Sequence, residues 1–142
     1  MTQEDKELLL KDLCARLPYG VIVDTPKGKG RVCDINLTIF GTEVGVNINP
    51  TVRDTFSIND VKPYLFPLSS MTEEQIEELG IERDKDTLLL AQGLRRIGEG
   101  DKSLKGKLIA YNAIDWLNKN HFDFRNLIGR GLAIDCTNLN IY

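Results

Sequence analysis

The sequence predicts an α+β fold: an N-terminal helix, then a three- to four-stranded antiparallel meander or small open barrel, then a C-terminal helical portion with a possible final short strand. Two patterns carry this prediction. Apolar residues recur at helical spacing in the first 17 positions and again after position 107. Between positions 19 and 58, apolar and polar residues alternate in short runs separated by Gly and Pro, which is typical of antiparallel strands. The length of 142 residues predicts a single domain, 1–142.

The first expected element is a helix over residues 2–17. Leu9 and Leu13 fall on one apolar stripe, and acidic residues crowd the first turn, where the helix dipole favours them. Pro18 disfavours helical geometry at the residue before it and Gly20 follows, so we expect the helix to end there. A single apolar stripe needs a partner, which we expect to be the β-rich segment.

The β-rich part covers residues 19–58. Its composition predicts one turn at 26–30, and Gly41 opens a second. Short strands joined by tight turns indicate an antiparallel meander. The expected strands cover residues 21–23, 31–40, 42–48 and 52–56.

A helical part is predicted over residues 72–130. Thr72 and Gln75 have the spacing of a capping box, in which each side chain bonds the other residue's amide. Gly80 is placed to end the helix that this box begins. We therefore expect a short helix over 73–79.

Four further elements follow. Asp86 is expected to cap a helix, and a second amphipathic helix is expected over 107–120. Asp123 can cap a short helix over 124–128. The chain then returns as a possible strand over 132–136.

Composition argues against several classes of protein. A net charge of −3 and a pI of about 5.2 provide no overall positive field that would attract nucleic acid or an anionic membrane. Cys14, Cys33 and Cys136 have no zinc-site spacing, so we expect small buried side chains in a reducing compartment. No apolar run approaches the about 20 residues of a transmembrane helix, and the acidic N-terminus lacks a secretion-signal pattern. We expect a cytoplasmic protein with no membrane contact and no cofactor.

Several segments carry a family resemblance. They are LCARLPYG at 13–20, VKPYL at 61–65, PLSSMTEE at 67–74, DWL at 115–117 and HFDFR at 121–125. In these segments the chain resembles an uncharacterised family of short proteins from prophages, phages and mobile elements of gut anaerobic bacteria. The resemblance covers about half of the chain. It implies a bacterial or phage-borne cytoplasmic protein, and it carries over no catalytic residue because the family has no activity to transfer.

The leading functional hypothesis is a non-enzymatic accessory protein of a phage or mobile element that binds another protein. The candidate surface is Tyr64, Leu65 and Phe66, because the flanking Pro63 and Pro67 are expected to prevent regular strand pairing and leave side chains free. The alternative is that these side chains close one end of the barrel. The hypothesis also reflects what the sequence lacks, namely a nucleophile motif, a metal-ligand set and a cofactor loop.

The alternative function is nucleic-acid binding by a basic hairpin tip. Alternating cations project to one side of such a hairpin, and the intervening glycines let backbone amides approach a phosphate. Tyr19 or Phe40 would supply a stacking surface for a base. The other interpretation is a charged hairpin that discourages edge-to-edge pairing. The residues proposed for nucleic-acid contact are Lys27, Lys29, Arg31, Arg95 and Arg96.

A third hypothesis is a small hydrolase or transferase that uses His121 as a general base. Asp123 would orient the imidazole, although the same carboxylate is also explained as a helix cap. A catalytic histidine has to line a pocket beside a second titratable group. A structural one would instead pack against Phe122 or Phe124.

Overall fold

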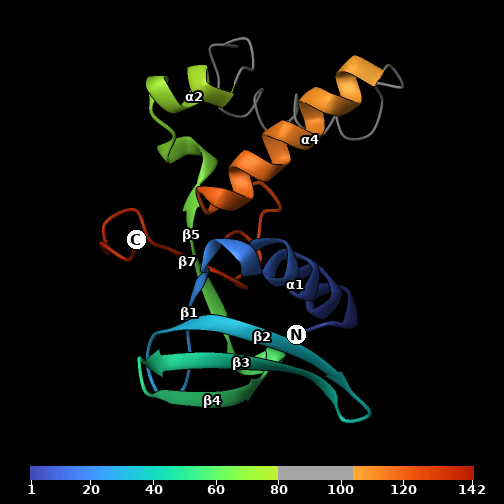
Figure 1. The fold of residues 1–142 in the computed structure, drawn as a ribbon, viewed down its shortest axis with the longest axis vertical. Helices are drawn as coiled ribbons and strands as arrows, with labels where there is room; N and C mark the ends of the chain where they lie inside the picture. Colours follow the sequence, from blue (N-terminus) through green and yellow to red (C-terminus); the bar gives the residue numbers. More distant parts are fainter. Residues whose placement is uncertain (80–103) are drawn as a thin grey trace.

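The computed structural model describes residues 1–79 and 104–142, so the helix expected after Asp86 lies outside the described part of the chain. The helices are α1 (Gln3–Arg16), α2 (Glu73–Leu79) and α4 (Leu104–Lys119). The strands are β1 (Ile22–Asp24), β2 (Gly30–Thr38), β3 (Gly41–Asn49), β4 (Val52–Ser57), β5 (Lys62–Pro67), β6 (Phe122–Asp123) and β7 (Ile134–Asp135). The predicted α+β class with an N-terminal helix is confirmed. In Figure 1, α1 lies above β2 and β3, α2 lies at the far end of the molecule from these strands, and α4 runs from that end back to α1.

A capping box fixes the start of α1. The Thr2 hydroxyl accepts from the Asp5 amide at 3.1 Å, and the Asp5 carboxylate accepts from the Thr2 amide at 3.2 Å. The predicted end at Pro18 is only partly right, because Leu17 keeps helical dihedrals (φ −50°, ψ −45°) and the chain continues as a 3₁₀ turn, Leu17–Tyr19. Proline is tolerated there because the first helical turn needs no amide donor. Gly20, with a left-handed φ of 72°, ends the turn.

Strands β1 to β4 form the predicted antiparallel meander, with four strands. Ile22 lies opposite Arg31, Arg31 opposite Asn47, and Asn47 opposite Arg53. Residues directly opposite each other on adjacent strands have neighbouring side chains on the same face. One row of neighbouring side chains therefore crosses all four strands.

The proline-flanked segment is a strand, which corrects the expectation that it would not pair regularly. Pro63 lies opposite Val23 in the antiparallel pairing of β5 with β1. On its other side β5 pairs in parallel with both β6 and β7, so the sheet is mixed and has seven strands. The prolines lie near the two ends of β5, and the amide of Phe66 between them donates to the His121 carbonyl at 2.9 Å. A strand can contain a proline wherever the backbone amide at that position does not have to donate a hydrogen bond to the neighbouring strand.

The predicted capping box before α2 is confirmed. The Thr72 hydroxyl accepts from the Gln75 amide at 3.3 Å, and the Gln75 side chain accepts from the Thr72 amide at 2.9 Å. The helix then covers the predicted residues 73–79. The amphipathic helix predicted over 107–120 is also present, as α4.

The short helix predicted after Asp123 is wrong. The Asp123 carboxylate accepts from the Leu127 and Ile128 amides, both at 2.9 Å, but residues 124–133 form turns and bends. Asn126, inside the predicted helix, has a positive φ of 60°, which the interior of a right-handed helix does not contain. The final strand is shorter than the predicted 132–136, because the strand pairing with β5 covers only Ile134–Asp135.

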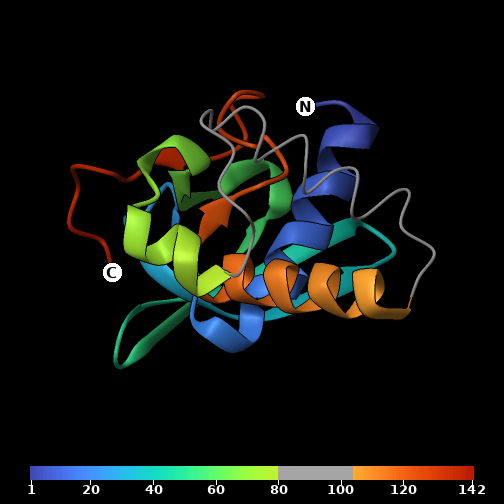
Figure 2. The same ribbon diagram turned by 90° about the horizontal axis from the view of Figure 1, so that it is seen from above.

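Within the described residues, the core has two hydrophobic clusters. The larger lies between α1 and the sheet, and the smaller packs α2 against the second half of α4 and β6. α1 and α4 approach each other near their C-terminal ends (Figures 1 and 2), where the Arg16 side chain reaches the Leu117 carbonyl at 3.4 Å. Buried members of the larger cluster include Leu9, Leu13, Val23, Val32, Val44, Val46 and Leu65; those of the smaller are Met71, Leu79, Ala113, Leu117 and Phe122.

Candidate functional site

The hairpin joining β2 and β3 ends in an apolar tip, formed by Leu37, Ile39 and Phe40. These side chains are 74%, 93% and 91% exposed. In Figure 1 the hairpin loop lies at the lower right of the molecule, well away from α2 and α4. Water-exposed apolar side chains are ordinary when isolated, but a contiguous group is characteristic of an interaction surface.

Local hydrogen bonds hold the tip in shape. The Thr38 hydroxyl donates to the Gly41 carbonyl at 2.9 Å and accepts from the Phe40 amide at 3.2 Å. Gly41 has a φ of 123°, a conformation that residues with a Cβ rarely adopt. The turn is therefore stabilised by its polar groups, and Ile39 and Phe40 are free to face water.

The charges around the tip are few and acidic. Between residues 34 and 45 the only ionisable side chains are Asp34 and Glu43. Asp34 forms an ion pair with Arg53 at 2.6 Å. An anionic lipid surface would favour cations beside the apolar tip, and no Lys or Arg lies between residues 34 and 45.

The three residues predicted to bind a protein lie inside the sheet. Tyr64 is 4% exposed, Leu65 is fully buried, and Phe66 is partly buried against the smaller cluster. Tyr64 and Leu65 thus contribute to packing, as the barrel-closing alternative anticipated. The apolar tip of the β2–β3 hairpin could have been found from the sequence, because two bulky apolar residues, Ile39 and Phe40, directly precede the turn glycine.

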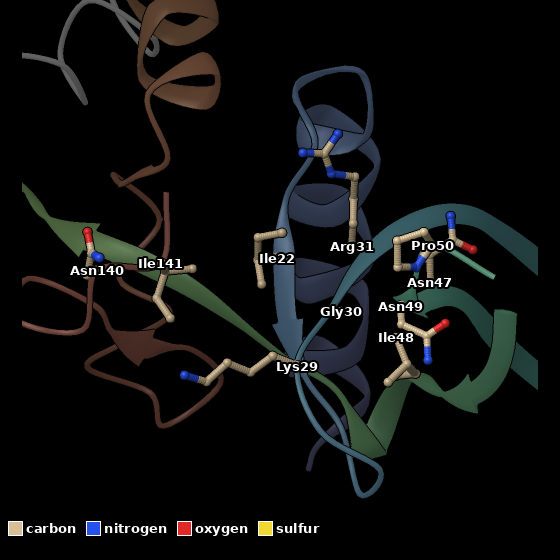
Figure 3. A pocket seen from close by; sticks show the side chains of 10 residues that line it. All are labelled: Ile22, Lys29, Gly30, Arg31, Asn47, Ile48, Asn49, Pro50, Asn140 and Ile141. Atoms are coloured by element: carbon tan, nitrogen blue, oxygen red, sulfur yellow. The ribbon is translucent and has the colours of Figure 1, made fainter. Parts of the chain in front are cut away.

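The basic residues predicted for nucleic-acid contact are dispersed. Lys29 and Arg31 line one groove (Figure 3), whereas Lys27 pairs with Asp54 at 2.8 Å. Arg95 and Arg96 lie outside the described residues.

Neither predicted stacking partner fits the basic residues as expected. Phe40 lies at the far end of β2 from Arg31. The Tyr19 hydroxyl bonds the Asp115 carboxylate, which raises the pKa of Tyr19. The structure therefore brings Lys29 and Arg31 to one groove, and neither Tyr19 nor Phe40 is among the residues that line it.

His121 is a buried residue with no hydrogen bond from its side chain within the described residues. It is 6% exposed, has a left-handed φ of 61°, and stacks on Tyr142 with ring centroids 3.8 Å apart. Burial, assisted by the nearby Arg16, lowers the pKa of His121 to about 4. Asp123 does not orient the ring, because its carboxylate is bonded to backbone amides.

A pocket of about 510 Å³ lies beside His121. The titratable groups that line it with His121 are Lys119 and Tyr142, and Ser70 supplies a hydroxyl. That hydroxyl donates to the Pro67 carbonyl at 2.7 Å, so it is not paired with the imidazole. Within the described residues, the imidazole therefore forms no hydrogen bond to a group that it could activate as a general base.

A buried ionic cluster, Asp12, Arg16 and Arg125, was not found by sequence reasoning. Asp12 and Arg16 are both fully buried, one helical turn apart, with an N–O distance of 2.8 Å. In the sequence they resemble an ordinary surface i,i+4 pair, so no signal reveals their burial.

The expectation of buried cysteines holds for Cys136 and is wrong for Cys14 and Cys33, which are exposed.

No family model, curated protein or solved structure matches the chain. Across residues 1–79 and 104–142, no helix has both the length and the apolar character needed to cross a bilayer. In the same residues, no group of three His, Cys, Asp or Glu side chains is arranged to hold a metal ion.

Proposed function

We propose that this protein is a non-enzymatic binding module that docks onto another protein through the apolar tip of the β2–β3 hairpin. The observation that carries the proposal is the exposure of Ile39 and Phe40, at 93% and 91%, on a turn whose backbone is held by hydrogen bonds. A pre-ordered tip loses little conformational entropy when it binds. An accessory role in a phage or mobile element rests on the sequence resemblance alone.

The partner we propose is a folded protein with an apolar pocket. Each fully buried Ile or Phe side chain contributes roughly 1.5–3 kcal/mol of hydrophobic free energy, so two such anchors are enough to dominate a small interface. Asp34 is compensated by Arg53, so the charge that Glu43 adds near the tip favours a neutral or basic rim on the partner. This charge disfavours an anionic membrane, which attracts basic surroundings.

The test compares two variants that each remove exposed apolar surface. Ile39→Ser combined with Phe40→Ser alters the tip, and Val52→Ser is the matched control, because Val52 is 45% exposed on the edge strand β4. Affinity capture from lysate of the source cells, with quantitative mass spectrometry, should recover a partner with the wild type and the control. The purified partner should bind the tip variant at least about tenfold more weakly, as expected when more than 1.4 kcal/mol is lost.

Two results would overturn the proposal. One is recovery of the same proteins, with the same affinity, by the tip variant. The other is tip-dependent binding to phosphatidylcholine–phosphatidylserine vesicles with no tip-dependent protein, which would make the hairpin a membrane anchor.

A further inference from the structure

A groove of about 600 Å³ opens where the start of β2, the end of β3 and residues 140–141 come together (Figure 3). Its polar lining consists of Lys29, Arg31, Asn47, Asn49 and Asn140. The remaining lining residues are Ile22, Gly30, Ile48, Pro50 and Ile141, so among residues 1–79 and 104–142 no carboxylate side chain lines the groove. The chain as a whole has 21 acidic residues and a net charge of −3. The groove is thus a locally positive site on an acidic protein.

The two cations of the groove are not neutralised. Within the described residues, neither Lys29 nor Arg31 forms an ion pair. By contrast, Lys27 and Arg53 on the same part of the sheet are paired with carboxylates, at 2.8 Å and 2.6 Å. An anion entering the groove would therefore not have to displace a protein carboxylate.

The sheet register holds these side chains together. Arg31 lies between Ile22 and Asn47 in the row that crosses the strands. Lys29 precedes Arg31 by two residues, a spacing of about 7 Å along an extended chain. Figure 3 shows the two cationic side chains diverging on either side of Ile22, with Lys29 extending toward Ile141. The two cations therefore lie at separate parts of the groove lining, with the apolar side chain of Ile22 between them.

Both cations have defined surroundings. The Lys29 ammonium lies 5.5 Å from the centre of the Tyr64 ring, a cation–π distance. The Arg31 guanidinium packs over Gly20, where an added Cβ would lie 3.1 Å from its carbon. These contacts restrict the two side chains and lower the entropy lost on binding.

Hydrogen bonds also fix the orientation of one side-chain carboxamide in the groove, that of Asn49. The Asn49 carboxamide oxygen accepts from both the amide and the hydroxyl of Thr51, each at 3.0 Å. Its NH₂ group is then the part left to face a ligand. With Lys29 and Arg31, the groove offers at least three hydrogen-bond donors.

We propose that this groove binds a small phosphate-bearing ligand of about mononucleotide size. Charged donors form strong hydrogen bonds with phosphate oxygens, and the volume lies within the about 300–1,000 Å³ typical of small-molecule sites. A nucleic-acid strand is disfavoured because the net charge is −3 and no exposed aromatic side chain lines the groove for base stacking. The site is separate from the apolar tip, since β2 extends for nine residues, or about 30 Å, between them.

The experiment is an NMR titration of the ¹⁵N-labelled protein with adenosine 5′-monophosphate, inorganic phosphate, adenosine and a thymidine decanucleotide. We expect the monophosphate, and more weakly inorganic phosphate, to shift the amide signals of Gly30, Asn47 and Asn49 at millimolar concentration or below. Adenosine should shift them much less. Lys29→Gln combined with Arg31→Gln should weaken monophosphate binding at least about tenfold.

The matched control is Lys11→Gln combined with Lys119→Gln, which removes the same charge from two exposed residues outside the groove and should leave binding unchanged. Three results would overturn the inference: no groove shifts with either phosphate probe, equal shifts with adenosine, or equal weakening by the control. Tighter, strongly salt-dependent binding of the decanucleotide would replace the small ligand with a nucleic-acid strand.

Discussion

Arg125 donates to the carboxylate of Asp12 at 2.8 Å, although the two residues are 113 positions apart in the sequence. The same carboxylate accepts from Arg16 at 2.8 Å and 3.0 Å. A remaining Arg16 donor reaches the Phe122 carbonyl at 2.7 Å. One buried carboxylate therefore joins α1 to the segment that follows α4.

Asp12→Asn should destabilise the protein strongly. The substitution keeps the side-chain shape but leaves the Arg16 guanidinium buried without its counter-charge, which typically costs about 3–5 kcal/mol. Urea unfolding monitored by circular dichroism would measure the loss. Arg130→Gln is the control, because it breaks exposed ion pairs with Glu4 and Asp5 and should change the free energy of unfolding little. Equal effects of the two substitutions would show that the buried cluster contributes nothing special.

His121 should make stability depend on pH between about 6.5 and 4. Above pH 6.5 the imidazole is neutral in both states; as the pH falls toward 4, the unfolded chain takes up a proton that the folded protein does not. Stability therefore decreases as the pH falls, by at most about 3 kcal/mol for this group. His121→Asn removes the titration, and Asn tolerates the left-handed φ of 61°. Urea midpoints of wild type and variant from pH 7.5 to pH 5 should diverge; parallel curves would refute this.

Tyr142 should protect β1 from hydrogen exchange. Its hydroxyl donates to the Tyr64 carbonyl at 2.9 Å and accepts from the Ile22 amide at 3.1 Å, and burial raises the pKa of this phenol. Tyr142→Phe removes both bonds while keeping the ring that stacks on His121. We expect the Ile22 amide to exchange roughly tenfold faster, as a loss of about 1.4 kcal/mol implies. The Val46 amide serves as the internal reference, and equal acceleration there would mean global rather than local destabilisation.

The apolar tip should contribute almost nothing to folding. Ile39→Ser combined with Phe40→Ser should change the free energy of unfolding by less than about 0.5 kcal/mol, because both side chains face water. Val46→Ala, at a fully buried position, should cost on the order of 2 kcal/mol. Thermal or urea unfolding of the two variants side by side gives the comparison. A large loss in the tip variant would show that the tip packs against the rest of the molecule.

Sequence patterns that extend over a few residues predicted the helices and strands whose hydrogen bonds join residues close together in the sequence. The capping box of Thr72 and Gln75 located α2, and alternating apolar residues located the four strands of the meander. The parallel strand β6 was not predicted, since it has two residues and pairing with β5 supplies its only signal, whereas β7 covers only two residues of the strand predicted over 132–136. Two residues are too few to show an alternating pattern.

The candidate site was harder to predict than the fold. Pro63 suggested an unpaired segment. A strand can nevertheless contain a proline at a position where no backbone amide has to donate to the neighbouring strand, and with β5 paired in this way Tyr64 is buried. Lys29 and Arg31 were identified from composition, whereas their amide neighbours come from β3 and from residue 140. Which residues meet across strands depends on register, and register is a tertiary property.

The ionic link between Asp12 and Arg125 has a consequence for biosynthesis. The ribosome makes α1 first, yet the guanidinium and carbonyl groups that complete its buried polar side are made more than a hundred residues later. A nascent chain paused before that point would display a helix with unmatched charges, an available substrate for chaperones or proteases. Folding of this protein should therefore be a late event in its translation.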